Sequence, residues 1–304
     1  MTILPERAAD VLRIGVAEKL GMSVDEAAFG VFRIINNNLS NGIRYVSVAQ
    51  GHDPRDFALM SFGGAGSVTA TMQARDLGIT RVLVLRTASV FCALGELQSD
   101  LRVSQIHALA GRVERVPAKQ LSEQLDRMVN SARSEIEAVP GVQGIRIERQ
   151  AEMRYVGQVH ELPTPIPDDA DMEVALQGAV QAFHALHRQR YAFNMLQKPV
   201  EMLAVRQEVV GTRAWDVPSY EVIENPDAAK AVKARRKVCF PSNGSYAWID
   251  TPIYDGERLK PGHAFQGPAI IEELDTTIAL QPGDKLRLNR YQIYEIDVAE
   301  AAHG

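Results

Sequence analysis

The feature that most constrains the fold of this chain is a glycine-rich run, Phe62-Gly63-Gly64-Ala65-Gly66, which we call the glycine turn. The apolar run that ends at Met60 predicts a strand before it, and apolar residues at helical spacing between Val68 and Leu77 predict a helix after it. Glycines at a strand-to-helix junction let a ligand approach the backbone, and the helix start leaves amide donors free for a phosphate or carboxylate. The run matches neither the Rossmann nor the P-loop pattern. The glycine turn is therefore compatible with nucleotide binding and also with a tight turn that holds no ligand.

The residues around the glycine turn predict an α/β unit. Ser23-Val24-Asp25-Glu26 has the residue types of a capping box and predicts the start of a long helix. Apolar residues then recur at helical spacing, and we expect them to form the buried face of that helix. They are Phe32, Ile35, Leu39, Ile43 and Val46. The run Asn36-Asn37-Asn38 interrupts the polar side, and either one asparagine faces a cleft or all three are solvated. A strand at 82–85 and a helix after 88–95 complete an order that implies a crossover onto a parallel or mixed sheet.

The pattern changes after residue 103. Alternating residues predict three strands and amphipathic spacing predicts two helices. The strands are expected at 103–109, 145–149 and 152–156, the helices at 117–138 and 171–190, a proline-rich turn at 163–167 and a β-rich stretch at 200–210. A charged stretch without a period, 214–236, predicts a linker, and the remaining residues predict short strands of a small β barrel or sandwich. The predicted fold is thus α/β with a β-rich C-terminal region, divided into 1–103, an α+β domain at 104–213, and 214–304.

Composition limits the classes of partner. With 304 residues, 46% of them hydrophobic, the chain is long enough for about two domains with buried cores. Its net charge of −5 gives no general attraction to nucleic acid or an anionic bilayer, so we expect neither as a partner. No apolar run approaches the roughly 20 residues of a membrane-spanning helix, and the first residues lack signal-peptide features, which predicts a cytoplasmic protein. Cys92 and Cys239 are far apart in sequence and predict neither a disulfide framework nor a cysteine zinc site.

Three other groups of residues are weaker candidates for a site. His184 and His187 lie three positions apart on a predicted helix and would form a zinc site with His160, although no matching carboxylate completes a known motif. The run Glu272-Glu273-Leu274-Asp275 is interpreted either as paired catalytic carboxylates or, more simply, as a solvated turn. Cys92 lies in an apolar segment and is interpreted as a small core residue rather than a nucleophile. We therefore predict no metal site in this chain, and the sequence identifies no catalytic residue.

A set of motifs that occur in a fixed order runs through nearly the whole chain. They are Val24 to Gly51, Asp53 to Leu59, the glycine turn, Ala74 to Ile79, Ala93 to Gly95, Arg154 to Gln158, and Phe265 to Thr277. Together they resemble the hydantoinase A and oxoprolinase family, which includes ATP-dependent hydantoinases, 5-oxoprolinase, and the large subunits of acetone and acetophenone carboxylases. The resemblance implies the actin and sugar-kinase fold, in which ATP lies between two ribonuclease-H-like lobes.

The resemblance covers only the C-terminal half of the family's pattern, so this chain would supply the second lobe. The glycine turn would face adenosine and ribose, with Asn37, Asp53 and Arg55 as neighbours. Relatives usually carry an Asp-Gly-Gly-Thr type phosphate loop in a preceding half, so another chain would hold most of the triphosphate and its Mg²⁺. The sequence departs from the family at Ser67 and Thr69, where relatives commonly have a proline and a histidine.

The resemblance also implies an activity. The chain is most similar to a subunit of the split acetophenone carboxylase type, which predicts an ATP-dependent, biotin-independent ketone carboxylase. In such an enzyme ATP phosphorylates a carbonyl-derived oxygen, and bicarbonate is the second substrate. The expected partners are other hydantoinase-like subunits of a hetero-oligomer, including the one with the N-terminal phosphate-binding half. Two alternatives remain open: a subunit of a hydantoinase or oxoprolinase type amidohydrolase, and a non-catalytic structural subunit.

Overall fold

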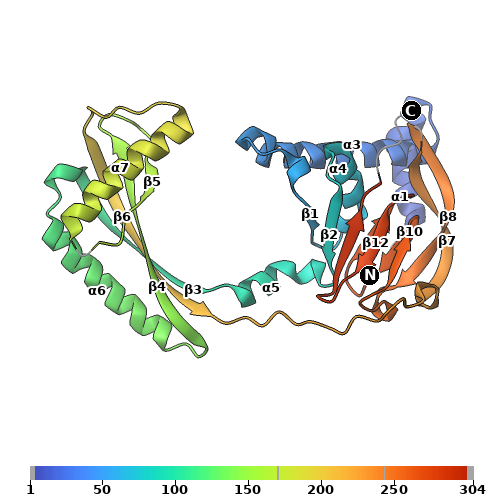
Figure 1. The fold of residues 1–304 in the computed structure, drawn as a ribbon. Coiled ribbons are helices and arrows are strands. Elements are labelled where there is room, and N and C mark those ends of the chain that lie inside the picture. Colours follow the sequence, from blue (N-terminus) through green and yellow to red (C-terminus); the bar gives the residue numbers. More distant parts are fainter. Residues whose placement is uncertain (1–3, 170, 243, 300–304) are drawn as a thin grey trace. The chain divides into compact units, whose positions relative to one another are not determined.

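The computed structural model describes residues 4–169, 171–242 and 244–299, which divide into two compact units (Figure 1). Unit 1 consists of two segments of the chain, one that ends at Gly95 and one that begins at Val217. Unit 2 is the segment between them, Glu96–Asp216. The predicted segments 1–103 and 214–304 therefore contribute to the same unit. The reason is strand pairing across the chain, because Val82 and Val84 in the first segment lie opposite Ile296 and Tyr294 in the last one.

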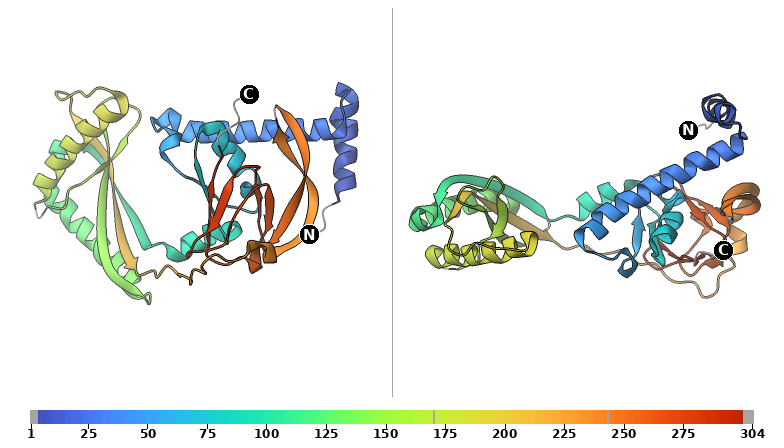
Figure 2. Two further views of the ribbon diagram at one scale, coloured as in Figure 1. Left: turned by 45° about the vertical axis from the view of Figure 1, so that its right-hand side comes forward. Right: turned by 90° about the horizontal axis from the view of Figure 1, so that it is seen from above.

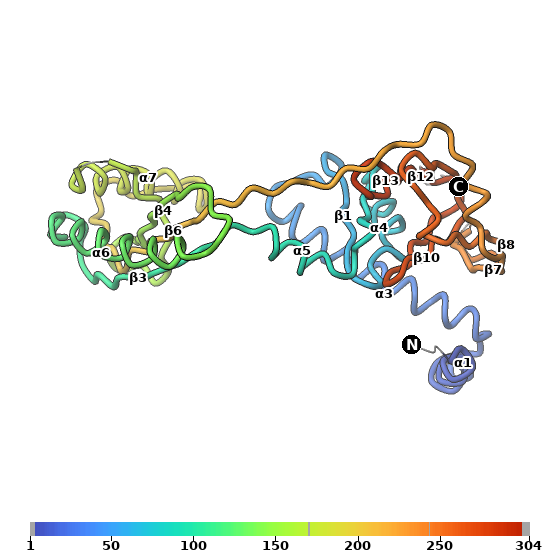
Figure 3. Tube along the Cα trace, turned by 90° about the horizontal axis from the view of Figure 1, so that it is seen from below, coloured from blue at the N-terminus to red at the C-terminus, as the bar shows by residue number. Residues whose placement is uncertain are grey.

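Unit 1 begins with helices α1 (Pro5–Leu12), a π-helical turn (Arg13–Ala17), α2 (Glu18–Leu20) and α3 (Val24–Val46). The predicted capping box at the start of α3 is confirmed. The Ser23 hydroxyl accepts a hydrogen bond from the Glu26 amide at 3.2 Å, and the Glu26 carboxylate accepts one from the Ser23 amide at 2.7 Å. Helix α1 lies across the N-terminal end of α3 (Figures 2 and 3), and none of its residues is buried.

The prediction that the apolar stripe of α3 is buried is wrong for most of that stripe. Ile35 and Leu39 are 48% and 46% exposed, and Val46 is 62% exposed. The buried residues of α3 are instead Ala27, Asn36 and Ser40. The face of α3 with Ser40 packs against helix α4 instead, and the Ser40 hydroxyl donates to the Asp76 carboxylate at 3.2 Å. Helix α3 thus presents an apolar face that its own chain leaves exposed.

The glycine turn lies in the predicted crossover. Strand β1 (Leu59–Ser61) leads into it, helix α4 (Ala70–Leu77) follows, and strand β2 (Arg81–Leu85) pairs with β1 in parallel. Gly78 ends α4 with φ +71°, as its position predicts, since this backbone region is open to glycine. After β2 the chain forms helix α5 (Phe91–Gln98), none of whose residues is buried.

The C-terminal region is β-rich, as predicted, and its strands form two sheets of unit 1. One sheet has the order β1-β2-β13-β12-β9 and therefore includes the two N-terminal strands, and the other has the order β11-β10-β8-β7. The strands are β7 (Val232–Ser242), β8 (Ser245–Asp255), β9 (Ala264–Gln266), β10 (Ala269–Glu272), β11 (Thr277–Leu280), β12 (Lys285–Leu288) and β13 (Ile293–Asp297). The largest core cluster joins both sheets to α4, with Val84, Leu280 and Tyr294 almost fully buried.

Unit 2 is an antiparallel sheet of order β3-β6-β4-β5 that packs against two helices. Its elements are β3 (Leu101–Arg112), α6 (Ala118–Glu137), β4 (Val142–Tyr155), β5 (Leu162–Pro165), α7 (Met172–Tyr191) and β6 (Val200–Arg213). One core cluster contains residues of both helices and of the sheet, so α6 and α7 cover the same face (Figure 1).

Two local predictions in unit 2 are wrong. The expected strands 145–149 and 152–156 are one strand, β4, in which bulges absorb the change of pattern. The expected proline-rich turn 163–167 contains strand β5, where Pro163 and Pro165 lie opposite Glu152 and Gln150. Prolines are tolerated there because β5 is an edge strand.

The segment between the units is irregular from Ala214 to Asp227, and strand β7 begins at Val232, so the predicted linker 214–236 ends earlier than expected. Across the described ranges, every helix is too short or too polar to span a bilayer.

Candidate functional site

The glycine turn is held from two sides by hydrogen bonds. The Gly63 amide donates to the Ala88 carbonyl at 2.7 Å. The Thr276 hydroxyl, in the loop between β10 and β11, lies 3.4 Å from the Gly63 carbonyl and 3.2 Å from the Gly64 carbonyl. These contacts engage the Gly63 amide and the carbonyls of Gly63 and Gly64, so the amides that follow Gly63 are the ones that are available.

Glycine is required in the turn for two different reasons. Gly63 has φ +85°, a conformation that disfavours residues with a side chain, and open space lies where its Cβ would be. A Cβ on Gly66 would lie 3.1 Å from the Ser61 hydroxyl, which leaves little room for one. At Gly64 the corresponding neighbour is the Asp275 carbonyl at 3.6 Å, an ordinary contact distance. The turn is thus tight near Ser61 and open at Gly63.

Backbone amides on one side of the turn have no hydrogen-bond acceptor within the described residues. Among the hydrogen bonds of the described residues, the amides of Gly64, Ala65 and Gly66 have no protein acceptor. Gly64 and Ala65 are exposed, so these amides can reach a ligand. Phe62 beside them is 50% exposed and packs on Phe91 with ring centroids 5.2 Å apart. Amide donors next to a half-exposed aromatic ring suit a ribose hydroxyl or phosphate oxygen next to a planar base.

The glycine turn fits one part of a nucleotide better than another. Its residues, Phe62 to Gly66, carry no carboxylate, hydroxyl or ammonium group. Mg²⁺ takes oxygen ligands, and a triphosphate is usually held by lysine or arginine as well as by amides. The turn therefore fits a nucleoside moiety, whereas the residues for the triphosphate and its Mg²⁺ must come from outside the turn.

The three predicted neighbours of the turn are engaged elsewhere. Asp53 and Arg55 form an exposed ion pair at 2.6 Å, and the Arg55 guanidinium lowers the pKa of Asp53 to about 2. Asn37 is exposed on α3, and the buried member of the asparagine run is Asn36. Within the described part of the chain, no hydrogen bond or ion pair joins Asn37, Asp53 or Arg55 to Phe62–Gly66.

The two helix histidines belong to a buried network in unit 2. The Tyr155 hydroxyl accepts from the Met195 amide at 2.8 Å and shares a second hydrogen bond with Nδ1 of His184 at 2.6 Å. Nδ1 of His187 donates to the Phe193 carbonyl at 2.7 Å. Burial lowers the pKa of His184, and His187 lowers it further. His160 is exposed, and over the described ranges no three histidine, cysteine or acidic side chains are grouped to hold a metal ion. The histidines brace helix α7 against strand β4.

The acidic run after β10 is not a uniformly solvated turn, which corrects the simpler interpretation. The side chain of Glu273 is only 3% exposed and pairs with Arg86 at 2.9 Å. Glu272 pairs with Lys233 at 3.0 Å, and Asp275 is exposed, as is Leu274 between them. The carboxylates of Glu272 and Glu273 are therefore held in different ion pairs and do not form a catalytic pair.

Cys92 lies on helix α5 and is exposed, so its interpretation as a core residue is wrong. The helical spacing of its apolar neighbours does not produce a buried face, since α5 buries none of its residues.

Known proteins show what the chain is similar to. The caprolactamase subunit alpha of Pseudomonas jessenii is 33% identical over 296 residues, which is 96% of this chain and 42% of that protein. The acetophenone carboxylase gamma subunit of Aromatoleum aromaticum is 26% identical, over 99% of this chain and 42% of that one. The chain thus spans less than half the length of these relatives.

Solved structures share the fold. The crystal structure of the ATP-dependent caprolactamase from Pseudomonas jessenii matches 97% of this chain and 43% of its own, with a TM-score of 0.75 and 30% identity. A nucleotide-free acetone carboxylase structure matches 97% of this chain and 43% of its own, with a TM-score of 0.74 and 22% identity, and supports the fold alone.

Family models agree with the resemblance seen in the motifs. Residues 3–105 match the hydantoinase/oxoprolinase model, and residues 114–299 match the model of the hydantoinase/oxoprolinase C-terminal domain. The second match alone covers more than half of the chain, and the first contains the glycine turn. The chain therefore belongs to the hydantoinase/oxoprolinase family.

Proposed function

We propose that this chain is a subunit of an ATP-dependent enzyme and that its glycine turn contacts the adenosine part of ATP. The observation that carries the proposal is the row of amides at Gly64, Ala65 and Gly66, which are without protein acceptors in the described structure and lie beside the half-exposed ring of Phe62. The caprolactamase that shares the fold is described as ATP-dependent, which supports the same assignment. The turn has no groups suited to the triphosphate and Mg²⁺, so in this proposal residues outside the turn hold them.

The exposed apolar surface of the N-terminal helices supports a subunit role. Val11 and Ile14 are 71% and 59% exposed, and on α3 Ile34 is 62% exposed in addition to Ile35 and Leu39. Large apolar side chains left exposed in this number favour burial against another protein surface. The partner we propose is a hydantoinase-like polypeptide that carries the phosphate-binding half of the fold.

Two reactions are candidates for the complex. ATP-dependent hydrolysis of a cyclic amide is favoured by the 33% identity to the caprolactamase subunit. ATP-dependent, biotin-independent carboxylation of a ketone with bicarbonate, the leading prediction from the sequence, is the second candidate and is supported by 26% identity to the acetophenone carboxylase subunit. In both, the substrate is a neutral carbonyl compound. Assays of the purified complex with cyclic amides and ketones, with and without bicarbonate, distinguish the two by which substrate stimulates ATP consumption.

The nucleotide role of the turn is tested at Ala65, whose side chain is exposed. In the assembled complex, Ala65→Asp places a negative charge beside the proposed ATP site, whereas Ala65→Asn adds nearly the same volume without charge. We expect Ala65→Asp to weaken ATP binding at least about tenfold relative to Ala65→Asn, because covering a carboxylate with the nucleoside costs more hydration free energy than covering a neutral amide. Isothermal titration with ATP measures the affinities, and thermal unfolding checks that both variants fold alike. Equal ATP affinities in the two variants would show that the turn does not contact the nucleotide.

A further inference from the structure

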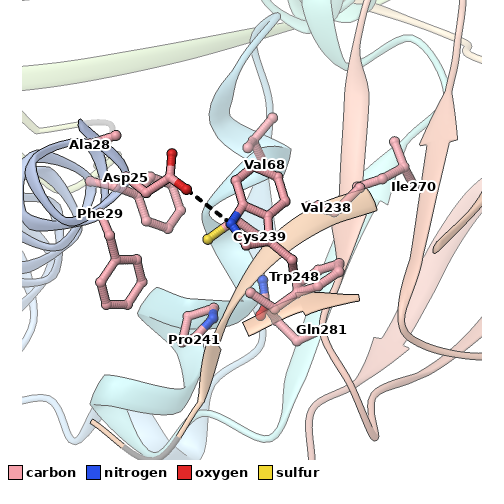
Figure 4. A pocket seen from close by; sticks show the side chains of 13 residues that line it. Asp25, Ala28, Phe29, Val68, Val238, Cys239, Pro241, Trp248, Ile270 and Gln281 are labelled. Atoms are coloured by element: carbon pink, nitrogen blue, oxygen red, sulfur yellow. Dashed lines mark hydrogen bonds between the residues drawn. The ribbon is translucent and has the colours of Figure 1, made fainter. Parts of the chain in front are cut away.

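Unit 1 contains a pocket that is separate from the amide side of the glycine turn. Its volume is about 380 Å³, within the roughly 300–1,000 Å³ typical of small-molecule sites. One wall is the N-terminal part of α3, with Phe29 and Phe32, and the opposite wall is the β7–β8 hairpin, with Phe240 and Trp248 (Figure 4). Ile270 and Ala279, on β10 and β11, form its inner end. The lining is therefore mainly aromatic and aliphatic, which favours an apolar ligand.

The pocket also has one polar group that lacks a partner. Gln281 lines it and is only 3% exposed. Its backbone amide donates to Asp284 at 3.2 Å, whereas no hydrogen bond of its side-chain amide occurs among the described residues. Both side-chain atoms of Gln281 remain accessible, since neither is among the fully enclosed unpartnered atoms. Leaving a nearly buried amide unpaired costs about 1–3 kcal/mol, so this side chain is a ready partner for a ligand.

The other polar residues of the pocket favour an uncharged ligand. The Asp25 carboxylate accepts a hydrogen bond from the Trp248 indole at 3.2 Å and is exposed at the rim (Figure 4). Burial raises the pKa of the Cys239 thiol, and the nearby Asp25 raises it further, so the thiol stays protonated. Among the described residues that line the pocket, none is a lysine or arginine. An anion would therefore meet a carboxylate and no cation, and this excludes ATP as the occupant.

We propose that this pocket binds a neutral small molecule with an apolar body and one carboxamide-like group, which pairs with the side-chain amide of Gln281. A carboxamide has both a donor and an acceptor, so it satisfies both halves of the glutamine amide in one contact. The aromatic walls from Phe29, Phe32 and Trp248 enclose the apolar body. This proposal stands apart from the nucleotide role of the glycine turn, and it concerns a different ligand class.

Binding is measured by the fluorescence of Trp248 in the full chain. Trp215 is the other tryptophan of the sequence and is replaced in a Trp215→Phe background. Benzamide is the neutral probe, benzoate the charged analogue and ethylbenzene the apolar one. We expect saturable binding of benzamide that Gln281→Met weakens roughly tenfold, while ethylbenzene binds both forms alike and benzoate binds neither. No saturable response to benzamide, or equal benzamide affinity in Gln281→Met, would overturn the proposal.

A second measurement does not depend on a change at Gln281. In a Cys92→Ser chain, Cys239 is the only cysteine, and its rate of alkylation reports on access to the pocket. Benzamide should slow this alkylation, and ethylbenzene should slow it at a comparable occupancy. Ala28→Phe fills the space next to Phe29 and should abolish protection by both probes. Unchanged alkylation at saturating benzamide would show that the pocket is not the binding site.

Discussion

The buried ion pair between Arg86 and Glu273 allows a quantitative test of what stabilises unit 1. The Arg86 guanidinium donates to the Glu273 carboxylate at 2.9 Å and to the Gln292 side chain at 2.7 Å. It also donates to the carbonyls of Gly256 and Leu259. The side chain of Arg86 is 22% exposed and that of Glu273 is 3% exposed. One guanidinium therefore ties the end of β2 to four other points of the unit.

Replacing Arg86 with methionine keeps most of the side-chain volume and removes every one of these donors. It leaves the Glu273 carboxylate buried, with the Tyr294 hydroxyl as its remaining donor. Breaking one side of a buried ion pair typically costs about 3–5 kcal/mol. In a unit of this size, each kcal/mol of lost stability lowers the melting temperature by about 2–4 °C. The loss of about 3–5 kcal/mol therefore predicts a fall in melting temperature of roughly 6–20 °C. The matched control is Arg236→Met, since Arg236 lies 3.3 Å from Glu272 and its side chain is 58% exposed.

The assay is thermal and urea unfolding of the full chain, followed by Trp248 fluorescence, since Trp248 belongs to unit 1. We expect Arg236→Met to change stability by no more than about 1 kcal/mol, as for exposed ion pairs. The double variant Arg86→Met/Glu273→Met should recover at least part of the loss, because it removes the uncompensated carboxylate. If Arg86→Met costs no more than Arg236→Met, or if the double variant is the less stable of the two, the reasoning is refuted.

Two further predictions concern unit 2. Gly211→Ala should destabilise it by about 1–3 kcal/mol, because the added Cβ would collide with Cγ2 of Ile136 on α6, and in an Ile136→Ala background, which lacks that methyl group, the same change should cost less in urea unfolding. If Gly211→Ala costs as much in the Ile136→Ala background, the collision is not the cause. The pKa of His184 is lowered from 6.5 in the folded chain, so the unfolded chain takes up the proton first, and stability is lost as pH falls below that value. His184→Gln should weaken this loss between neutral and acidic pH, and an unchanged pH profile would exclude His184 as its source.

The sequence correctly predicted features that depend only on a short run of neighbouring residues. The capping box at Ser23 and the left-handed end of α4 at Gly78 each depend on one short run, and the structure confirms both. The predicted helix 117–138 is α6, Ala118–Glu137, with Leu125 fully buried on its apolar side. Such features follow from backbone geometry and side-chain spacing alone, so they do not depend on the rest of the fold.

Features that depend on distant residues could not be predicted in this way. Glu273 is buried because Arg86, far away in the chain, reaches it, whereas an isolated glutamate pattern indicates an exposed residue. The pairing of β13 with β2 likewise has no local signal, because periodicity identifies a strand without naming its neighbour. The same limit applies to the stripe with Ile35 and Leu39 on α3: its spacing shows which face is apolar, not whether the chain covers it.

The two proposed sites share one structural element, the β10–β11 hairpin. Thr276 at its loop holds the carbonyls of Gly63 and Gly64, while Ile270 and Ala279 in its strands line the apolar pocket. This shared hairpin predicts that a ligand which shifts or rigidifies it at one proposed site changes binding at the other. Because coupling between two binding equilibria is reciprocal, any effect of ATP on benzamide affinity must equal the effect of benzamide on ATP affinity. The hairpin thus gives a physical route by which the occupancy of the pocket can be linked to nucleotide binding in the assembled complex.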